Sequence, residues 1–172
     1  MKPLLAFKSI LFALLLSGTV AVFFPFLVLT HSGVNVLRPS VSVSSFFAII
    51  VGLLGLGLLI HCIRGFAAYG RGTLAPIDAP KVLVVRGAYE YTRNPMYLAV
   101  LSILISETIL FQNGHMLTYT AIVFICFYLF VRFYEEPGLR KRFGVAYQDY
   151  CRVVPRWWFT LHPYGTCDRA GR

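Results

Sequence analysis

The stretch "TRNPMYLAVLSILISETILFQNGHMLTYTAIVFICFYLFVRFYEEPG", residues 92–138, decides the fold. It contains two apolar segments that are separated only by the polar connection "QNGH", so we predict an antiparallel helical hairpin over about residues 95–134. At ~1.5 Å per residue, each arm is about 25 to 30 Å long. Because the arms are equal in length, we expect "TRNPMY" and "RFYEEPG" to be neighbours, although about forty residues separate them.

The composition of the whole chain is that of a membrane protein. Its 172 residues are 58% hydrophobic and 13% charged, with a mean hydropathy of +0.70, which is too apolar for a soluble domain. A spanning helix needs ~20 apolar residues. Four stretches are candidates, of which the third is short: 4–30, 41–63, 97–111 and 116–134. We therefore predict an all-α integral membrane protein with about four transmembrane helices, the first of them retained rather than cleaved as a signal peptide.

The basic residues indicate the orientation. Every lysine and arginine except Arg38 lies at the N-terminus, between the second and third apolar stretches, or at and beyond the end of the fourth. The positive-inside rule therefore predicts that both termini and the loop 64–96 are cytoplasmic. This topology explains most of the net charge of +9, so we expect the lipid bilayer, and no nucleic acid, as a partner. Neither the cysteines nor the histidines have metal-ligand spacing, and no metal site is expected.

The segment after the hairpin has a helical pattern. In "EEPGLRKRFGVAYQDYCRVV", an apolar face is formed by Leu139, Phe143, Ala146, Tyr147 and Tyr150. We expect an amphipathic helix on the cytoplasmic membrane surface.

The start of the third apolar helix has features of an anion site. Asn94 can cap this helix, and Pro95 fits its first turn because the missing N–H has no helical partner there. Arg93 lies beside the unsatisfied N–H groups and the positive end of the helix dipole, which together favour a carboxylate or a phosphate.

Two adjacent acids are expected across the corner from Arg93. Glu135 and Glu136 lie at a helix C-terminus, where the dipole disfavours negative charge, so they need a cation. One interpretation is a structural ion-pair network with Arg93 or Arg132. The other is a zwitterionic ligand whose carboxylate meets Arg93 and whose ammonium meets Glu135. Its apolar walls could come from three tyrosines: Tyr89, Tyr91 and Tyr97.

These motifs carry a family resemblance. "GAYEYTRNPMY" (87–97), "EEPGLRKRFGVAYQDY" (135–150) and "VPRW" (154–157) resemble the isoprenylcysteine carboxyl methyltransferase and phospholipid methyltransferase superfamily of integral-membrane enzymes. The resemblance covers about residues 70–158 and implies S-adenosylmethionine, a zwitterionic amino acid at one end, as cofactor. It also implies that Glu135 holds the cofactor's amino group. The other cofactor-binding residues, with Arg93, are then Lys81, Val82, Leu83, Val84, Tyr89, Asn94, Pro95, Met96 and Tyr97.

The acceptor of the methyl group is left open. Eukaryotic prenylcysteine enzymes resemble "RHP" where this chain has "RNP" (93–95), and their substrate-associated arginine is replaced by Val131, next to Arg132. We expect a carboxylate or an amine of a lipid-like or other membrane-accessible acceptor, with Arg132 and Glu136 as the candidate catalytic residues that orient it.

The resemblance also divides the chain. Residues 1–63 are expected to form two N-terminal transmembrane helices, and residues 64–172 the catalytic region, with its active site on the cytoplasmic face. Two other functions remain open: a non-enzymatic membrane scaffold or lipid-binding protein, and a membrane oxidoreductase resembling the sterol reductases. A nicotinamide fingerprint of the form G-x-G-x-x-G after a strand is absent from the sequence.

Overall fold

The computed structural model describes residues 11, 14–36, 42–69, 83, 85–161 and 163–164. Within these residues all regular structure is helical, which confirms the all-α prediction. The π-helical turns are η1 (Thr19–Phe23) and η4 (Val131–Glu135), and the 3-10 turn is η3 (Gly87–Glu90). The α-helices are α2 (Phe24–His31), α3 (Val43–Tyr69), α4 (Pro95–Phe111), α5 (Gly114–Phe130) and α6 (Glu136–Val153).

The helices have the lengths and compositions of membrane spans. In the described part of the chain, three helical segments are long and apolar enough to cross a bilayer: Leu14–His31, Val43–Gly65 and Gly114–Val153. Helix α4 is apolar but has only 17 residues, about 26 Å, against a hydrocarbon core of about 30 Å. The chain is therefore an integral membrane protein whose third expected span is short, as its sequence predicts.

The chain divides into two compact units. Unit 1 contains residues 60–95 and 129–172, and unit 2 contains residues 14–59 and 96–128. The helical hairpin belongs mainly to unit 2, whereas the residues on both sides of it belong to unit 1.

Helices α4 and α5 form the predicted antiparallel hairpin, with 17 residues in each arm. Near the connection, the hydroxyl oxygens of Thr108 and Thr120 are 3.0 Å apart. Further along, the rings of Tyr97 and Phe127 have centroids 4.8 Å apart. The side chain of Asn113 caps α5, because its Oδ1 accepts hydrogen bonds from the N–H groups two and three residues later, at 2.8 and 3.1 Å.

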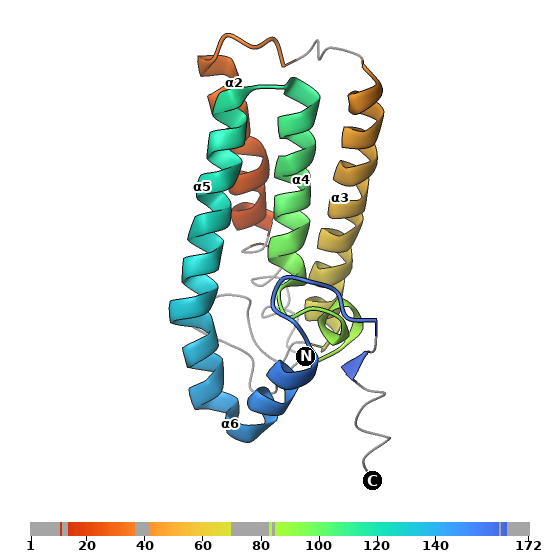
Figure 1. Cartoon of the computed structure of the whole chain (residues 1–172), viewed down its shortest axis with the longest axis vertical. Coiled ribbons are helices and arrows are strands. Elements are labelled where there is room, and N and C mark those ends of the chain that lie inside the picture. The colour runs from red at the N-terminus through yellow and green to blue at the C-terminus, as the bar shows by residue number, and fades with distance from the viewer. Residues whose placement is uncertain are drawn as a thin grey trace. The chain divides into compact units, whose positions relative to one another are not determined.

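Helix α3 lies directly against α4 because small residues face each other (Figure 1). A Cβ added to Gly55 would lie 2.9 Å from Ser102 Cβ and 3.0 Å from the carbonyl oxygen of Ala99. The hydroxyl of Ser106 donates to the carbonyl oxygen of Ala48 at 2.7 Å. The helices approach too closely at this point for any larger residue than glycine.

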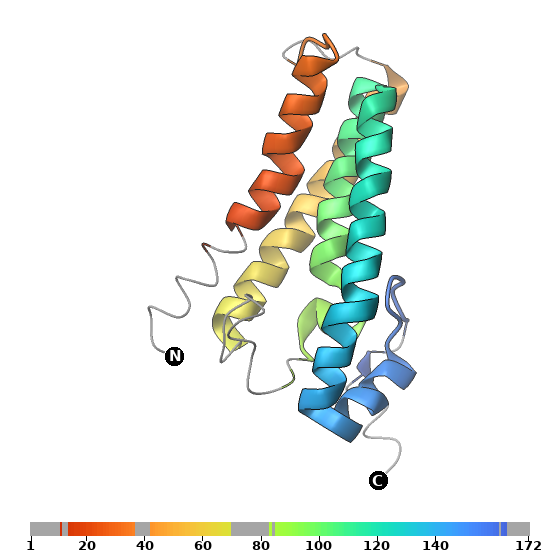
Figure 2. The same cartoon turned by 90° about the vertical axis from the view of Figure 1, so that its left-hand side faces the viewer.

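On its other side α4 lies beside α5 (Figure 2). Helix α5 in turn contacts η1 and α2. The phenol of Tyr119 donates to the carbonyl oxygen of Val20 at 2.8 Å, and the rings of Tyr119 and Phe24 lie 6.4 Å apart. Unit 2 is thus a helical bundle in which α4 lies between α3 and α5.

In unit 1, helix α6 presents the predicted apolar face. Tyr147 and Tyr150 are buried with Val154, and Leu139 and Phe143 pack against them. Further contacts to this cluster come from Leu83, Val85, Cys151, Val153 and Tyr164.

The prediction of this apolar face is wrong for one residue. Ala146 is exposed. The cause is Gly144, whose φ of 55° and ψ of −125° interrupt the helical geometry and change the register between the two halves of α6.

Candidate functional site

A buried carboxylate lies at the centre of unit 1. Glu136 is only 4% exposed, and both of its oxygens accept hydrogen bonds from arginines. Arg93 Nη1 lies 3.1 Å from Oε1. Arg156 binds it through two nitrogens, with Nε 2.6 Å from Oε1 and Nη2 2.8 Å from Oε2. This two-pronged geometry makes Arg156 the principal partner of the acid.

In the cluster of Arg93, Glu136 and Arg156, two guanidinium groups bind the same carboxylate. Arg93 Nη1 also lies 2.9 Å from Cys151 Sγ. Its Nε is buried and has no hydrogen-bond acceptor within the described residues. This nitrogen gives the cluster a donor that an additional anionic group would satisfy.

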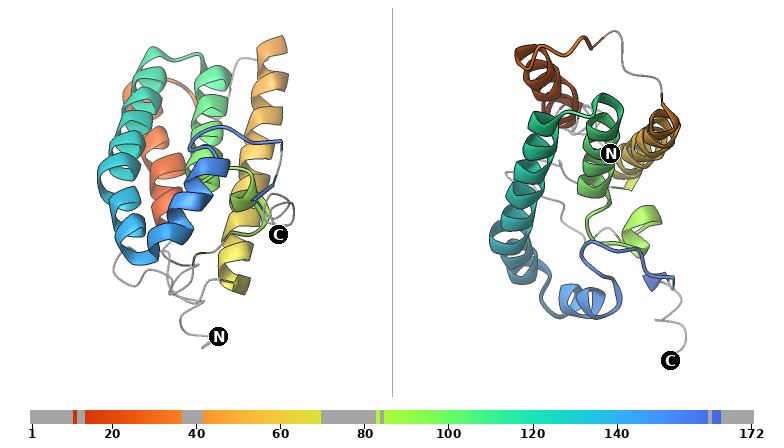
Figure 3. Two further views of the ribbon diagram at one scale, coloured as in Figure 1. Left: turned by 60° about the horizontal axis from the view of Figure 1, so that its bottom comes forward. Right: turned by 45° about the horizontal axis from the view of Figure 1, so that its top comes forward.

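The residues before α4 are joined to the C-terminal strap, which we define as residues 154–161 (Figure 3). The N–H of Arg93 donates to the carbonyl oxygen of Pro155 at 3.0 Å. Thr92 Oγ1 and Asn94 Nδ2 both donate to the carbonyl oxygen of Arg156, at 3.4 and 3.1 Å. Asn94 thus uses its amide to hold the strap, while α4 begins at Pro95 as predicted.

Two further hydrogen bonds extend this connection. The N–H of Thr160 donates to the carbonyl oxygen of Tyr91 at 2.9 Å. The phenol of Tyr150 donates to the carbonyl oxygen of Tyr89 at 2.7 Å. Thr92 is fully buried between these anchors. The start of α4, the strap and α6 consequently form one connected structure.

The π-helical turn η4 determines which glutamate faces the arginines. The N–H of Glu136 donates to the carbonyl oxygen of Val131, five residues earlier, so the turn contains one more residue than an α-helical turn. Glu136 lies inside the cluster, whereas Glu135 is half-buried. Turns of this kind occur often at functional sites.

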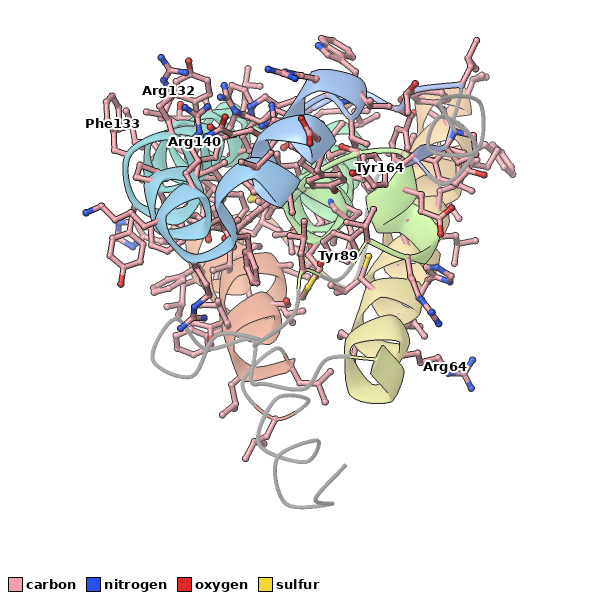
Figure 4. All side chains as sticks on the ribbon, turned by 90° about the horizontal axis from the view of Figure 1, so that it is seen from below. Arg64, Tyr89, Arg132, Phe133, Arg140 and Tyr164 are labelled. Atoms are coloured by element: carbon pink, nitrogen blue, oxygen red, sulfur yellow. The ribbon has the colours of Figure 1, made fainter. Side chains whose placement is uncertain are left out.

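Beside η4 there is an open depression of about 340 Å³. It is lined by Arg132, Phe133, Glu136, Pro137 and Arg140. Figure 4 shows Arg132, Phe133 and Arg140 close to one another. Arg132 and Arg140 are exposed, and Phe133 is 71% exposed, so this surface combines two cations with an apolar ring.

Gly87 fixes the conformation of the turn η3, which precedes Arg93 in the chain. Its φ is +61°, and an added Cβ would lie 2.8 Å from Nε2 of His61. Its N–H donates to Glu90 Oε1 at 3.2 Å. Only glycine combines this backbone conformation with so close a neighbour.

The structure brings some of the predicted site residues together. Arg93 and Glu136 are 43 positions apart in the sequence and in direct contact. Asn94 is linked to this pair because its side-chain amide donates to the carbonyl oxygen of Arg156. Leu83 packs on the tyrosine cluster of α6. Three predicted cofactor residues lie outside the described residues: Lys81, Val82 and Val84. Met96 and Tyr97 form the start of α4, in unit 2.

Arg156 was not predicted as a site residue. Its position in the motif "VPRW" was the only available signal, because the strap has no periodic pattern and lies 20 residues beyond Glu136. Of the interpretations considered for the two glutamates, the ion-pair network is present at Glu136, with Arg93 and Arg156 as its cations and not Arg132.

Comparison with known proteins adds to this geometry. Residues 43–146 match the model of a family described as phospholipid methyltransferase. The match includes α3, α4, α5, η4 and the first part of α6, together with Arg93 and Glu136. It ends before the strap that holds Arg156.

A curated relative is the Delta(14)-sterol reductase LBR of Gallus gallus, which is 28% identical over 88 residues. The aligned part is 51% of this chain, but the chain spans only 14% of the length of that relative. No solved structure matches the chain.

Proposed function

Because the chain belongs to the phospholipid methyltransferase family, we propose that it transfers a methyl group from S-adenosylmethionine to a carboxylate or amine of a lipid-like, membrane-accessible acceptor. The supporting observation is the cluster of Arg93, Glu136 and Arg156, in which Arg93 Nε is buried and has no acceptor among the described residues. A carboxylate fits such a place, and S-adenosylmethionine carries one next to an ammonium.

The residues divide the two charges of the cofactor between them. Arg93 binds the carboxylate, since its buried Nε has no acceptor among the described residues. Glu135, adjacent to the cluster, binds the ammonium. Glu136 has both oxygens engaged by arginines, so we assign it to positioning Arg93 and not to the acceptor.

When bound, S-adenosylmethionine supplies a methyl group that is already activated on a sulfonium. The chain then has to align the acceptor and exclude water, which can contribute several kcal/mol. A carboxylate acceptor is ionised and needs no base, whereas an amine acceptor must be neutral. Arg132, in the depression beside η4, fits an anionic group of the acceptor.

We place this site at the cytoplasmic face of the membrane. The support is the distribution of charge: η3, η4, α6 and the strap are in unit 1, and the basic residues are concentrated in the same segments. The cofactor would enter from the cytoplasm and the acceptor from the bilayer.

Calorimetric binding of S-adenosylhomocysteine to the detergent-solubilised chain tests the cofactor assignment. Glu135→Gln should weaken binding by about tenfold or more, because a charge-assisted hydrogen bond to the ammonium is lost. Asp149→Asn, which changes an exposed acid paired with Arg152, is the matched control and should bind normally. Normal binding by Glu135→Gln contradicts the role of that residue, and absence of binding by the wild type contradicts the proposed function.

The similarity to a sterol reductase supports a second candidate, a membrane oxidoreductase. A reductase needs a hydride donor, so the discriminating observation is binding of a reduced nicotinamide cofactor in the same calorimetric experiment. If the chain binds neither ligand, a non-enzymatic lipid-binding protein becomes the preferred interpretation.

A further inference from the structure

We propose that the C-terminal strap is a membrane-docking surface, with Trp158, Phe159 and Leu161 seated among the headgroups of a bilayer that contains anionic lipid. These side chains are 79%, 57% and 91% exposed, and they follow one another closely along the strap. The start of the strap behaves differently, since Val154 is completely buried. The exposed part is thus an apolar surface patch, the kind of surface that marks an interaction site.

The patch is held in place at both ends. Upstream, the side chain of Arg156 is bound to Glu136 and its carbonyl oxygen accepts a hydrogen bond from Asn94. Downstream, the N–H of Thr160 donates to the carbonyl oxygen of Tyr91. The apolar side chains are therefore presented on an anchored segment, and docking requires little further ordering of the backbone.

The anchors also adjoin, in the sequence, the ends of apolar segments. Asn94, which binds the strap, immediately precedes the first residue of α4, the apolar helix that enters the bilayer. Glu136, which binds Arg156, immediately follows the apolar segment formed by α5 and η4. Both attachments are next to the ends of apolar segments of the sequence, where we expect the chain to pass from hydrocarbon to water. Tryptophan is enriched at this depth because its ring is apolar and its N–H is polar.

Charge complementarity favours a lipid surface over a protein partner. Helix α6, which leads into the strap, has exposed cationic side chains at Arg140, Lys141, Arg142 and Arg152. The acids of this helix are Glu136, which is buried, and Asp149, which pairs with Arg152. Clustered cations beside an apolar patch are typical of segments that bind anionic membrane surfaces.

Docking of the strap has a consequence for the candidate site. Since the strap is bonded to Glu136 and to the residues before α4, a bilayer that holds the strap also holds this cluster at headgroup depth. An acceptor that diffuses in the membrane carries its polar reactive group at the same depth.

The chain contains two tryptophans, which makes the test direct. Trp157→Phe leaves Trp158 as the sole fluorophore, and Trp158→Phe leaves the half-buried Trp157 as the matched control. Each full-length variant is reconstituted into vesicles of phosphatidylcholine and phosphatidylglycerol. Quenching is measured with phosphatidylcholine brominated at shallow or deep acyl positions, and with acrylamide in the water.

We expect the fluorescence of Trp158 to be quenched more strongly by shallow bromines than by deep bromines or by acrylamide. Shallow bromines should also quench Trp158 more strongly than Trp157. Replacing phosphatidylglycerol by phosphatidylcholine should reduce this quenching. Quenching of Trp158 by acrylamide alone would place the strap in water, and protection from both quenchers would indicate a covering protein such as a second copy of the chain. Either result overturns the proposal, and neither depends on methyl transfer.

A second probe guards against misfolding of the Trp157→Phe variant. Leu161→Trp, added to the Trp158→Phe variant that keeps Trp157, places a second fluorophore at the most exposed position of the patch, and the difference between these two chains reports on that position. The same order of quenching is expected, and the reverse order contradicts docking.

Discussion

Glu136 is the residue on which the account of unit 1 depends. A carboxylate that is only 4% exposed is unfavourable by itself, and it is compensated here by three hydrogen bonds from two arginines. Those arginines come from the residue before α4 and from the strap. Removal of this single charge would leave two cations facing each other and would remove the ion pairs that join α6 to both of these segments.

Glu136→Gln should therefore destabilise the protein by about 3 to 5 kcal/mol, the range for breaking one partner of a buried ion pair. Glu135→Gln is the adjacent, isosteric control, and because Glu135 is only half-buried, loss of its charge should change stability by much less. The measurement is the unfolding transition in detergent micelles, followed by circular dichroism. Equal effects of the two substitutions would contradict the central position of Glu136.

At the scale of the elements, the sequence predicts the hairpin well. Two apolar segments around a polar tetrapeptide leave few alternatives, and equal arms then bring Arg93 to the glutamates. Pro95 identifies the start of α4 because proline is favourable only in the first turn. These predictions depend on local patterns, and the structure confirms them.

Other features of the elements could not be predicted from such patterns. A π-helical turn differs from an α-helical one by a single residue, so no periodicity distinguishes Glu135 from Glu136 in advance. The non-helical geometry of Gly144 interrupts the helix before Ala146, and the apolar periodicity gives no sign of it. Arg156 reaches Glu136 through the tertiary fold of an irregular segment.

The contact between α3 and α4 gives a prediction at this scale. Gly55→Ala should lower the unfolding midpoint, because the new Cβ would meet Ser102 Cβ at 2.9 Å. Gly57→Ala is the control in the same helix, since nothing lies within 4 Å of its added Cβ. Both substitutions gain the same helix propensity, up to about 1 kcal/mol, so the difference between them measures packing alone. A midpoint for Gly55→Ala that equals that of Gly57→Ala would contradict the close approach.

For the whole molecule, the distribution of lysine and arginine predicts orientation. A green fluorescent protein fused to the C-terminus should fluoresce in a bacterial host, and alkaline phosphatase at the same position should be inactive, because both outcomes require a cytoplasmic terminus. Phosphatase inserted at Gly114, in the connection of the hairpin, should be active. The opposite pattern of activities would reverse the orientation and move the candidate site away from the cytoplasm.

Family membership and the site together lead to one central claim, that the chain is a methyltransferase using S-adenosylmethionine. The most direct measurement uses purified protein in vesicles made from membrane lipid extract, supplied with S-adenosylmethionine labelled in its methyl group. The account predicts that label enters an extractable amphiphilic product, and that Glu135→Gln reduces this incorporation while Asp149→Asn does not. Failure of the wild-type protein to transfer label, in vesicles where it is folded and binds S-adenosylhomocysteine, would contradict the claim.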